Sequence, residues 1–304
     1  MDIEKRIAAS TYLLTEAAVI EALERRTDVR LHPGLLDAPL IYDPVGRECL
    51  IQLYQGFVAV AEAAGVPILL TTPTWRANRD RLAAAGMTHD LNADAVRFLC
   101  ELRRSCSGRP DRIGIGGLLG CANDGYRPKE GLSPEAAESL HAWQAERLAA
   151  AGVDFLLAAT LPGLPEAVGL ARALAATGVA YIISFVIDRG GRILDGTPLE
   201  KAFGTIDGTG TRPPLGYMIN CAHPSFLQAS REPAMVMRRL VGYQANASSR
   251  DHSELDGSDR RQADDLEDWG RGMVALNREY NVKILGGCCG TGLEHLRIIT
   301  RHLS

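Results

Sequence analysis

The 304-residue sequence has no apolar run that approaches the roughly 20 residues a membrane-spanning helix needs. It also has no strong excess of charge: 33 Lys and Arg residues against 37 Asp and Glu residues give a net charge of −4. Binding to nucleic acid or to an anionic membrane is therefore not indicated. The first ten residues, MDIEKRIAAS, are polar and lack the apolar segment of a signal peptide. Together these absences predict a cytoplasmic protein.

Several common catalytic motifs are missing as well. The sequence contains no glycine-rich phosphate loop, no Gly-x-Ser-x-Gly nucleophile elbow and no His-Glu-x-x-His metal motif. It shows no repeat of solenoid period and no linker rich enough in Pro, Gly or Ser to divide the chain. We therefore expect a single domain that spans residues 1–304.

The chain does contain a regular alternation of short apolar or β-branched runs with longer helical stretches. Several runs are continuously apolar, as is typical of parallel strands covered on both faces. The predicted strands are 12–14, 66–71, 112–116, 155–158, 181–185, 216–220, 240–243 and 282–285, and the clearest helices are 134–152, 165–178, 262–280 and 293–303. Eight strands alternating with helices in a chain of this length predict an α/β fold, a (β/α)8 TIM barrel, rather than an open doubly wound sheet.

The seven cysteines are an odd number, and a chain of this length can bury a core without disulfides. In a reducing cytoplasm we do not expect disulfide bonds. Four cysteines are scattered, and we interpret them as small buried apolar residues: Cys49, Cys100, Cys106 and Cys121.

The other three cysteines lie at the ends of predicted strands. Cys221 ends the strand at 216–220, and Cys288 and Cys289 follow the strand at 282–285. In a (β/α)8 barrel, functional groups gather at the carboxyl ends of the strands. One strand separates the strands at 216–220 and 282–285 in such a barrel. The ends of these two strands therefore lie about 10 Å apart, at about 4.8 Å per strand. Their thiolates can then converge on one zinc ion through bonds of about 2.3 Å. The adjacent cysteine pair alone would favour a redox pair or core packing, and the third cysteine favours zinc.

Three thiolate ligands leave the fourth tetrahedral position of zinc open, which is typical of catalytic rather than structural zinc. A substrate thiol bound at that position is held as the thiolate at neutral pH, because the metal stabilises the anion. The thiolate is the nucleophilic form of sulfur. The pattern therefore indicates attack by a thiol on a methyl group.

Several segments resemble the homocysteine S-methyltransferase family, which includes the betaine- and S-methylmethionine-dependent enzymes and the homocysteine domain of methionine synthase. The most specific are Asn220-Cys221 with Pro224 close behind, and GGCCGTG at 286–292. Supporting segments are ILLTTPTWRAN at 68–78, AAGVDFLLAATLP at 150–162 and SFVID at 184–188. The resemblance covers most of the chain. It implies a (β/α)8 barrel with Cys221, Cys288 and Cys289 as zinc ligands.

The same resemblance implies substrate contacts, and here the sequence departs from the family. Glu16 takes the place of an aspartate that follows the first strand, and Ala17 and Ala18 replace two glycines. Ala159 precedes Thr160 where the family usually has a glutamate that faces the substrate ammonium. Losing such a partner weakens the binding of an α-amino acid by roughly 1.5–3 kcal/mol. We still expect Glu16 and Thr160 to contact the substrate.

Two further residues are candidates for the site. Asn246 follows the predicted seventh strand and could occupy or gate the fourth zinc position, or it could simply cap a loop. Trp75 follows the second strand and could receive a cationic methyl donor on its ring, or it could pack in the barrel. The polar segment 247–261 is interpreted as a solvated surface loop, with a mobile lid as the alternative.

These features predict a zinc-dependent methyltransferase that moves a methyl group from a small activated donor to homocysteine and gives methionine. S-methylmethionine, S-adenosylmethionine and betaine-like compounds are the candidate donors. One alternative is the same chemistry on a different thiol or selenol. Another is a non-catalytic barrel that binds zinc and a thiol. The expected partners are thus a small-molecule thiol acceptor and a methyl donor. The sequence leaves the donor, the true acceptor and the oligomeric state open.

Overall fold

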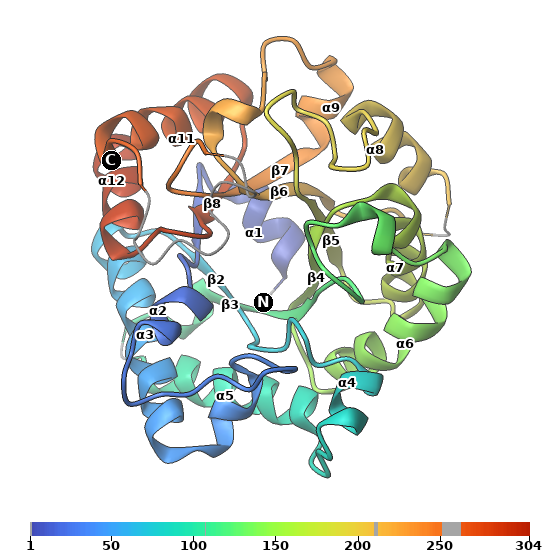
Figure 1. The fold of residues 1–304 in the computed structure, drawn as a ribbon. Coiled ribbons are helices and arrows are strands. Elements are labelled where there is room, and N and C mark those ends of the chain that lie inside the picture. The colour runs from blue at the N-terminus through green and yellow to red at the C-terminus, as the bar shows by residue number, and fades with distance from the viewer. Residues whose placement is uncertain (1, 107, 210–211, 251–262) are drawn as a thin grey trace.

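The computed structural model describes residues 2–106, 108–209, 212–250 and 263–304. At its centre is a closed barrel of parallel strands, in which each strand pairs with the next along the chain and β8 pairs with β1 (Figure 1). The strands are β1 (Leu13–Thr15), β2 (Ile68–Thr71), β3 (Ile113–Leu119), β4 (Phe155–Leu161), β5 (Tyr181–Phe185), β6 (Gly216–Ala222), β7 (Leu240–Ala245) and β8 (Ile284–Gly287). The predicted (β/α)8 barrel is confirmed.

All eight predicted strands are present, and most of them run further toward their carboxyl ends than the apolar pattern indicated. In β4 and β6 the pairing continues past an irregularity, between Ala158 and Leu161 and between Asn220 and Ala222. Each irregularity contains a residue with positive φ: Thr160 in β4 and Cys221 in β6. The sequence pattern could not show this, because such irregularities interrupt the alternation of side chains from which strands are predicted.

Helices surround the barrel and cover the outer faces of its strands, except for the first helix, which lies across one end of the barrel in the centre of the view (Figure 1). They are α1 (Ile3–Ala9), α2 (Ile20–Glu24), α3 (Pro44–Ala64), α4 (Arg79–Ala84), α5 (Leu91–Ser105), α6 (Pro134–Ala150), α7 (Leu164–Ala176), α8 (Leu199–Asp207), α9 (Ala234–Arg239), α11 (Leu266–Tyr280) and α12 (Leu293–Leu303). In the described part of the chain, no helix combines the length and the apolar composition needed to cross a membrane.

The predicted helices correspond to α6, α7, α11 and α12. Ser133 caps α6 by accepting a hydrogen bond from the Ala136 backbone N–H, and Pro134 occupies the first helical position. Helix α11 begins at Leu266 because the Asp265 carboxylate accepts hydrogen bonds from two N–H groups of its first turn. Most of the predicted loop or lid at 247–261 lies outside the described residues.

Helix α1 closes the amino-terminal end of the barrel. Ile3 is buried among side chains of the barrel interior, including Leu13 and Phe155. The Lys283 ammonium, just before β8, donates hydrogen bonds to two carbonyls at the end of α1. Arg6 donates to the Asp111 carbonyl shortly before β3. Because α1 occupies this end, the functional groups are left at the carboxyl ends of the strands.

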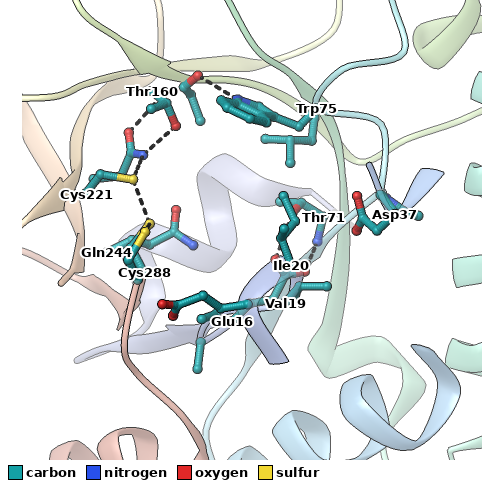
Figure 2. Close-up of a pocket in the computed structure, with 18 of the residues that line it drawn as sticks. Glu16, Val19, Ile20, Asp37, Thr71, Trp75, Thr160, Cys221, Gln244 and Cys288 are labelled. Atoms are coloured by element: carbon teal, nitrogen blue, oxygen red, sulfur yellow. Dashed lines mark hydrogen bonds between the residues drawn. The ribbon is translucent and has the colours of Figure 1, made fainter. Parts of the chain in front are cut away.

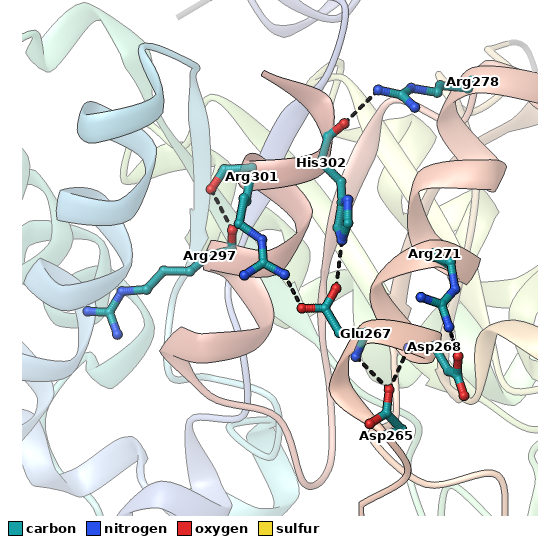
Figure 3. Close-up of polar contacts among 9 residues, drawn as sticks. Asp265, Glu267, Asp268, Arg271, Arg278, Arg297, Arg301 and His302 are labelled. Atoms are coloured by element: carbon teal, nitrogen blue, oxygen red, sulfur yellow. Dashed lines mark hydrogen bonds and ion pairs between the residues drawn. The ribbon is translucent and has the colours of Figure 1, made fainter.

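Helices α11 and α12 pack side by side and are joined on their outer surface by a polar network (Figure 3). Glu267 of α11 accepts hydrogen bonds from the Arg301 guanidinium and, at 2.9 Å, from His302 Nε2, both on α12. These contacts lower the pKa of the Glu267 carboxyl. The network stabilises the position of α12, which follows directly after the segment with Cys288 and Cys289.

Candidate functional site

A cavity of about 360 Å³ opens at the carboxyl ends of the strands. Two groups of residues on its wall have side chains that can ionise or bind a metal ion. The cysteine end consists of Cys221, Cys288 and Cys289, and the carboxylate end consists of Glu16 and Asp37. In Figure 2, Asp37 lies on the side of the cavity opposite Cys221 and Cys288.

At the cysteine end, the three Sγ atoms all lie within 4.8 Å of one another and could hold a metal ion. The Sγ atoms of Cys221 and Cys288 are 2.7 Å apart, and those of Cys288 and Cys289 are 4.0 Å apart. Cys221 is buried, and the other two are half-buried against the cavity. Strands six and eight therefore bring together the three residues that the sequence selected.

The backbone at Cys221 is strained, and a neighbouring side chain supports it. Its φ of 53° lies in the left-handed region, which residues other than glycine rarely adopt. Asn220 Nδ2 donates hydrogen bonds to Cys221 Sγ at 3.2 Å and to Thr160 Oγ1 at 2.8 Å. Asn220 Oδ1 accepts from the Thr160 backbone N–H and from Ser184 Oγ. Asn220 thus links β4, β5 and β6 and orients the sulfur of Cys221.

The backbone after β8 also depends on a special conformation. Gly290 adopts a φ of 77°, and its N–H donates a hydrogen bond to the Glu21 carboxylate. Gly286 packs so closely on β1 that a Cβ there would lie 2.7 Å from the Glu16 carbonyl oxygen. Side chains at these two positions would push the cysteine pair away from the cavity.

The hydrogen bonds among the sulfurs make their acidities unequal. Hydrogen bonds from Cys288 and Cys289 lower the pKa of Cys221 well below its usual value. The hydrogen bonds that Cys288 makes with Cys221 and Cys289 raise the pKa of Cys288.

The carboxylate end lies beside β1 and β2. Glu16 directly follows β1, and its carboxylate accepts hydrogen bonds from the Thr71 backbone N–H and, at 2.8 Å, from Thr71 Oγ1. Burial raises the pKa of Glu16 to about 8, although the two hydrogen bonds partly oppose this shift. Burial also raises the pKa of Asp37 to about 7.

Thr160 and Trp75, which the sequence predicted as substrate contacts, both line the cavity. Trp75 Nε1 donates a hydrogen bond to the Ala159 carbonyl at 3.2 Å, and the Arg76 guanidinium stacks 4.3 Å from the centre of the Trp75 ring. One ring face of Trp75 is therefore already occupied by a cation.

Asn246 is placed differently from the other predicted residues. It is buried directly after β7 but is not among the described residues that line the cavity, whereas Gln244 is. Its Oδ1 is a buried acceptor without a hydrogen-bond partner in the described part of the chain. The structure therefore leaves the predicted role of Asn246 as a ligand or gate of the metal site untested.

Sequence reasoning missed Asp37 and Tyr126. Asp37 comes from the long segment between β1 and α3, where no strand end or motif marks it. Tyr126 comes from the segment between β3 and α6, and its side chain hydrogen-bonds to Cys221. A functional residue on such a connection leaves no periodic signal, and only the polar loop around Tyr126 could have drawn attention to it.

A closed (β/α)8 barrel with three cysteine sulfurs at the carboxyl rim of a cavity defines a class of barrel enzymes with a thiol-rich centre. The chain belongs to the homocysteine S-methyltransferase family, whose family model matches residues 13–303. It is accordingly a methyltransferase of that family.

Solved structures of the Escherichia coli homocysteine methyltransferase MmuM share this fold. The metallated form matches with a TM-score of 0.78 and 20% sequence identity over 99% of this chain and 100% of the other. The apo form matches with a TM-score of 0.65 and 18% identity over 99% of each chain. A search of curated sequences found no match.

Proposed function

We propose that the protein is a zinc-dependent S-methyltransferase that transfers a methyl group from a small activated donor to homocysteine and gives methionine. The observation that carries this proposal is the convergence of Cys221, Cys288 and Cys289 at one end of the cavity, with their sulfurs within 4.8 Å of one another. The membership of the chain in the homocysteine S-methyltransferase family agrees with this chemistry.

The residues at the cysteine end fit zinc. Three thiol groups are a donor set that zinc prefers, and Asn246, whose buried Oδ1 has no hydrogen-bond partner among the described residues, stays the candidate for occupying or gating the fourth position. Zinc held by these cysteines would stabilise the thiolate form of a bound thiol at neutral pH. MmuM, a barrel of the same fold, has been solved in a metallated form, which supports the proposal that this chain also holds a metal.

The chain's own residues would orient the reactants. Asn220 holds Cys221 Sγ in place, and Thr160 and Trp75 line the wall next to the cysteine end. The acceptor thiolate attacks the methyl carbon of the donor and forms the new sulfur–carbon bond. The bond between the methyl group and the donor heteroatom breaks, and its electron pair stays on the donor, which leaves as a neutral sulfide or amine. S-methylmethionine, S-adenosylmethionine and betaine-like compounds fit this scheme, and fixing both reactants supplies most of the rate enhancement.

A different thiol or selenol acceptor is a second candidate. Ala159 lines the cavity and is 5% exposed, so this part of the wall carries no carboxylate that could face an ammonium group. A pocket altered at this position could accept a thiol other than homocysteine through the same chemistry.

We further propose a cytoplasmic enzyme whose functional unit is one domain over residues 1–304 and whose partners are these small molecules. All seven cysteines are free thiols, which fits a reducing compartment.

The decisive experiment is the metal content of the purified protein and of a Cys221→Ser variant, followed by turnover assays with homocysteine and each donor. The expected result is one zinc per chain, loss of zinc and of methionine formation in Cys221→Ser, and no change in a Cys106→Ser control. Absence of zinc under reducing conditions would refute the proposed site. Zinc without methionine formation, but with methylation of another thiol, would support the second acceptor.

A further inference from the structure

The charged residues around the cavity all have the same sign. Among the described residues that line it, the charged side chains are Glu16, Glu21, Glu24 and Asp37, and none is Lys, Arg or His. Glu21 and Glu24 lie on α2 near Cys289, and Glu21 already accepts the Gly290 N–H. The cavity wall therefore carries two acids besides Glu16 and Asp37, and no basic side chain among the described residues.

Asp37 is the acid with the fewest partners. Its side chain is 4% exposed, and it lines the cavity. In the described part of the chain, its carboxylate accepts a hydrogen bond only from its own backbone N–H. The preceding residue, Leu36, has a φ of 53°, so the chain adopts a strained turn directly before this carboxylate. A buried carboxylate with so little hydrogen bonding requires a cationic partner or must stay protonated.

The polar groups around Asp37 do not supply such a partner. The hydroxyl of Tyr54, which also lines the cavity, donates its hydrogen bond to the Thr71 carbonyl at 3.1 Å. The N–H and hydroxyl of Thr71 are both used by Glu16. The charge of Asp37 is felt at Glu16 and raises its pKa further. Two neighbouring acids thus share one region of the wall, and no described residue that lines the cavity supplies a cation for them.

We propose that Asp37, together with Glu16, binds the ammonium group of the thiol acceptor at the end of the cavity opposite the cysteines (Figure 2). This proposal rests on the proposed function, in which the acceptor sulfur lies at the cysteine end. Thr71 holds Glu16 in one orientation, and Asp37 supplies the second carboxylate that Ala159 does not. Since no described basic side chain faces the cavity, the amine of the acceptor is recognised by charge and its carboxylate is not.

The test measures the binding of three thiols to the zinc-loaded protein by calorimetry. Homocysteine carries both an amine and a carboxylate, homocysteamine lacks the carboxylate, and desaminohomocysteine lacks the amine. We expect an Asp37→Asn variant to bind homocysteine and homocysteamine at least about 10-fold more weakly, because a hydrogen bond to a charged group is lost. Binding of desaminohomocysteine should be unchanged or tighter. Asp28→Asn, on the same connection but paired with Arg26 on the surface, is the control.

Equal weakening of all three thiols would assign Asp37 a structural role and overturn the proposal while leaving the proposed function intact. If Asp37→Asn does not fold, the binding of the same thiols to the unmodified protein still tests the proposal. Tighter binding of homocysteamine than of desaminohomocysteine supports an ammonium site, and the reverse order contradicts it. If none of the thiols binds to the zinc-loaded protein, the proposed function itself fails, and the acceptor site fails with it.

Discussion

At the cysteine end of the cavity one cysteine lies near the end of β6 and two follow β8, whereas at the carboxylate end one acid follows β1 and the other comes from a long connection. Cys221 is supported by Asn220, whose side chain hydrogen-bonds to Cys221 in the same strand and to residues of β4 and β5. Asp37 has only its own backbone N–H as a hydrogen-bond donor among the described residues. One end is thus organised before any ligand arrives, and the other is left with unbalanced charge.

This difference indicates which cation each end binds. Three thiols held close together suit a metal ion, which can be tightly bound and retained. Two buried carboxyls with raised pKa values suit a cation that comes and goes, because an ammonium group can bind them as they ionise and leave again with the product. The comparison predicts that substitutions at the cysteine end affect metal binding, whereas substitutions at the carboxylate end affect binding of the acceptor.

The largest effect should follow from a Cys288→Ser variant. It should lose the metal, and its activity should fall by at least about 1,000-fold, because the charge stabilisation that a metal provides is worth several kcal/mol. Asp37→Asn should keep its full metal content. Elemental analysis of both variants tests this, and loss of metal from Asp37→Asn would show that the two ends are not independent.

The second prediction concerns how stability depends on pH. Burial raises the pKa of Glu16 from its ordinary value of 4.5 to about 8 in the folded protein, and it also raises that of Asp37 to about 7. The folded state therefore holds protons that the unfolded chain has released, so stability falls as pH rises from about 5 to about 8, by roughly 6 kcal/mol if both shifts contribute in full.

A Glu16→Gln variant should flatten this decline, because an amide does not ionise. Urea unfolding of the full chain at pH values across this window measures the effect. A decline equally steep in Glu16→Gln would mean that other groups cause it.

A smaller effect is expected at Asn220. Removing its side chain in Asn220→Ala deletes the donor to Cys221 Sγ while leaving all three cysteines in place. Metal affinity should fall about 10- to 100-fold, the usual result when a group that orients a metal ligand is lost. Competition with a chelator measures it. Ser184→Ala, which removes only one contact to Asn220, should have a weaker effect, and equal effects would contradict the orienting role.

The smallest effect is expected on the outer surface. Glu267→Gln removes a carboxylate that pairs with Arg301 and His302, but these groups are exposed and screened by solvent (Figure 3). The melting temperature should change by less than about 2 °C, with no change in metal content. Calorimetry checks this, and a large loss of stability would show that the contacts between α11 and α12 support the cysteine end.

The barrel could be predicted because each strand is a short apolar run between helical stretches, and this pattern survives in the sequence. The ends of β4 and β6 could not, since the left-handed residues Thr160 and Cys221 interrupt the pairing there. Asn246 shows a similar limit of prediction from the sequence. Its place after β7 was predictable, but its absence from the described cavity wall depends on how the chain turns beyond the strand.

The sequence by itself determined the (β/α)8 fold and the three cysteines at the ends of the sixth and eighth strands, and its resemblance to the family added Glu16 after the first. It could do so because strand ends converge in any barrel, so position along a strand predicts position in space. Only the tertiary structure brought Asp37 from a connecting segment to the cavity and Tyr126 to Cys221. Connections follow no periodic pattern, so the side chains they carry into a site are known only after the chain has packed.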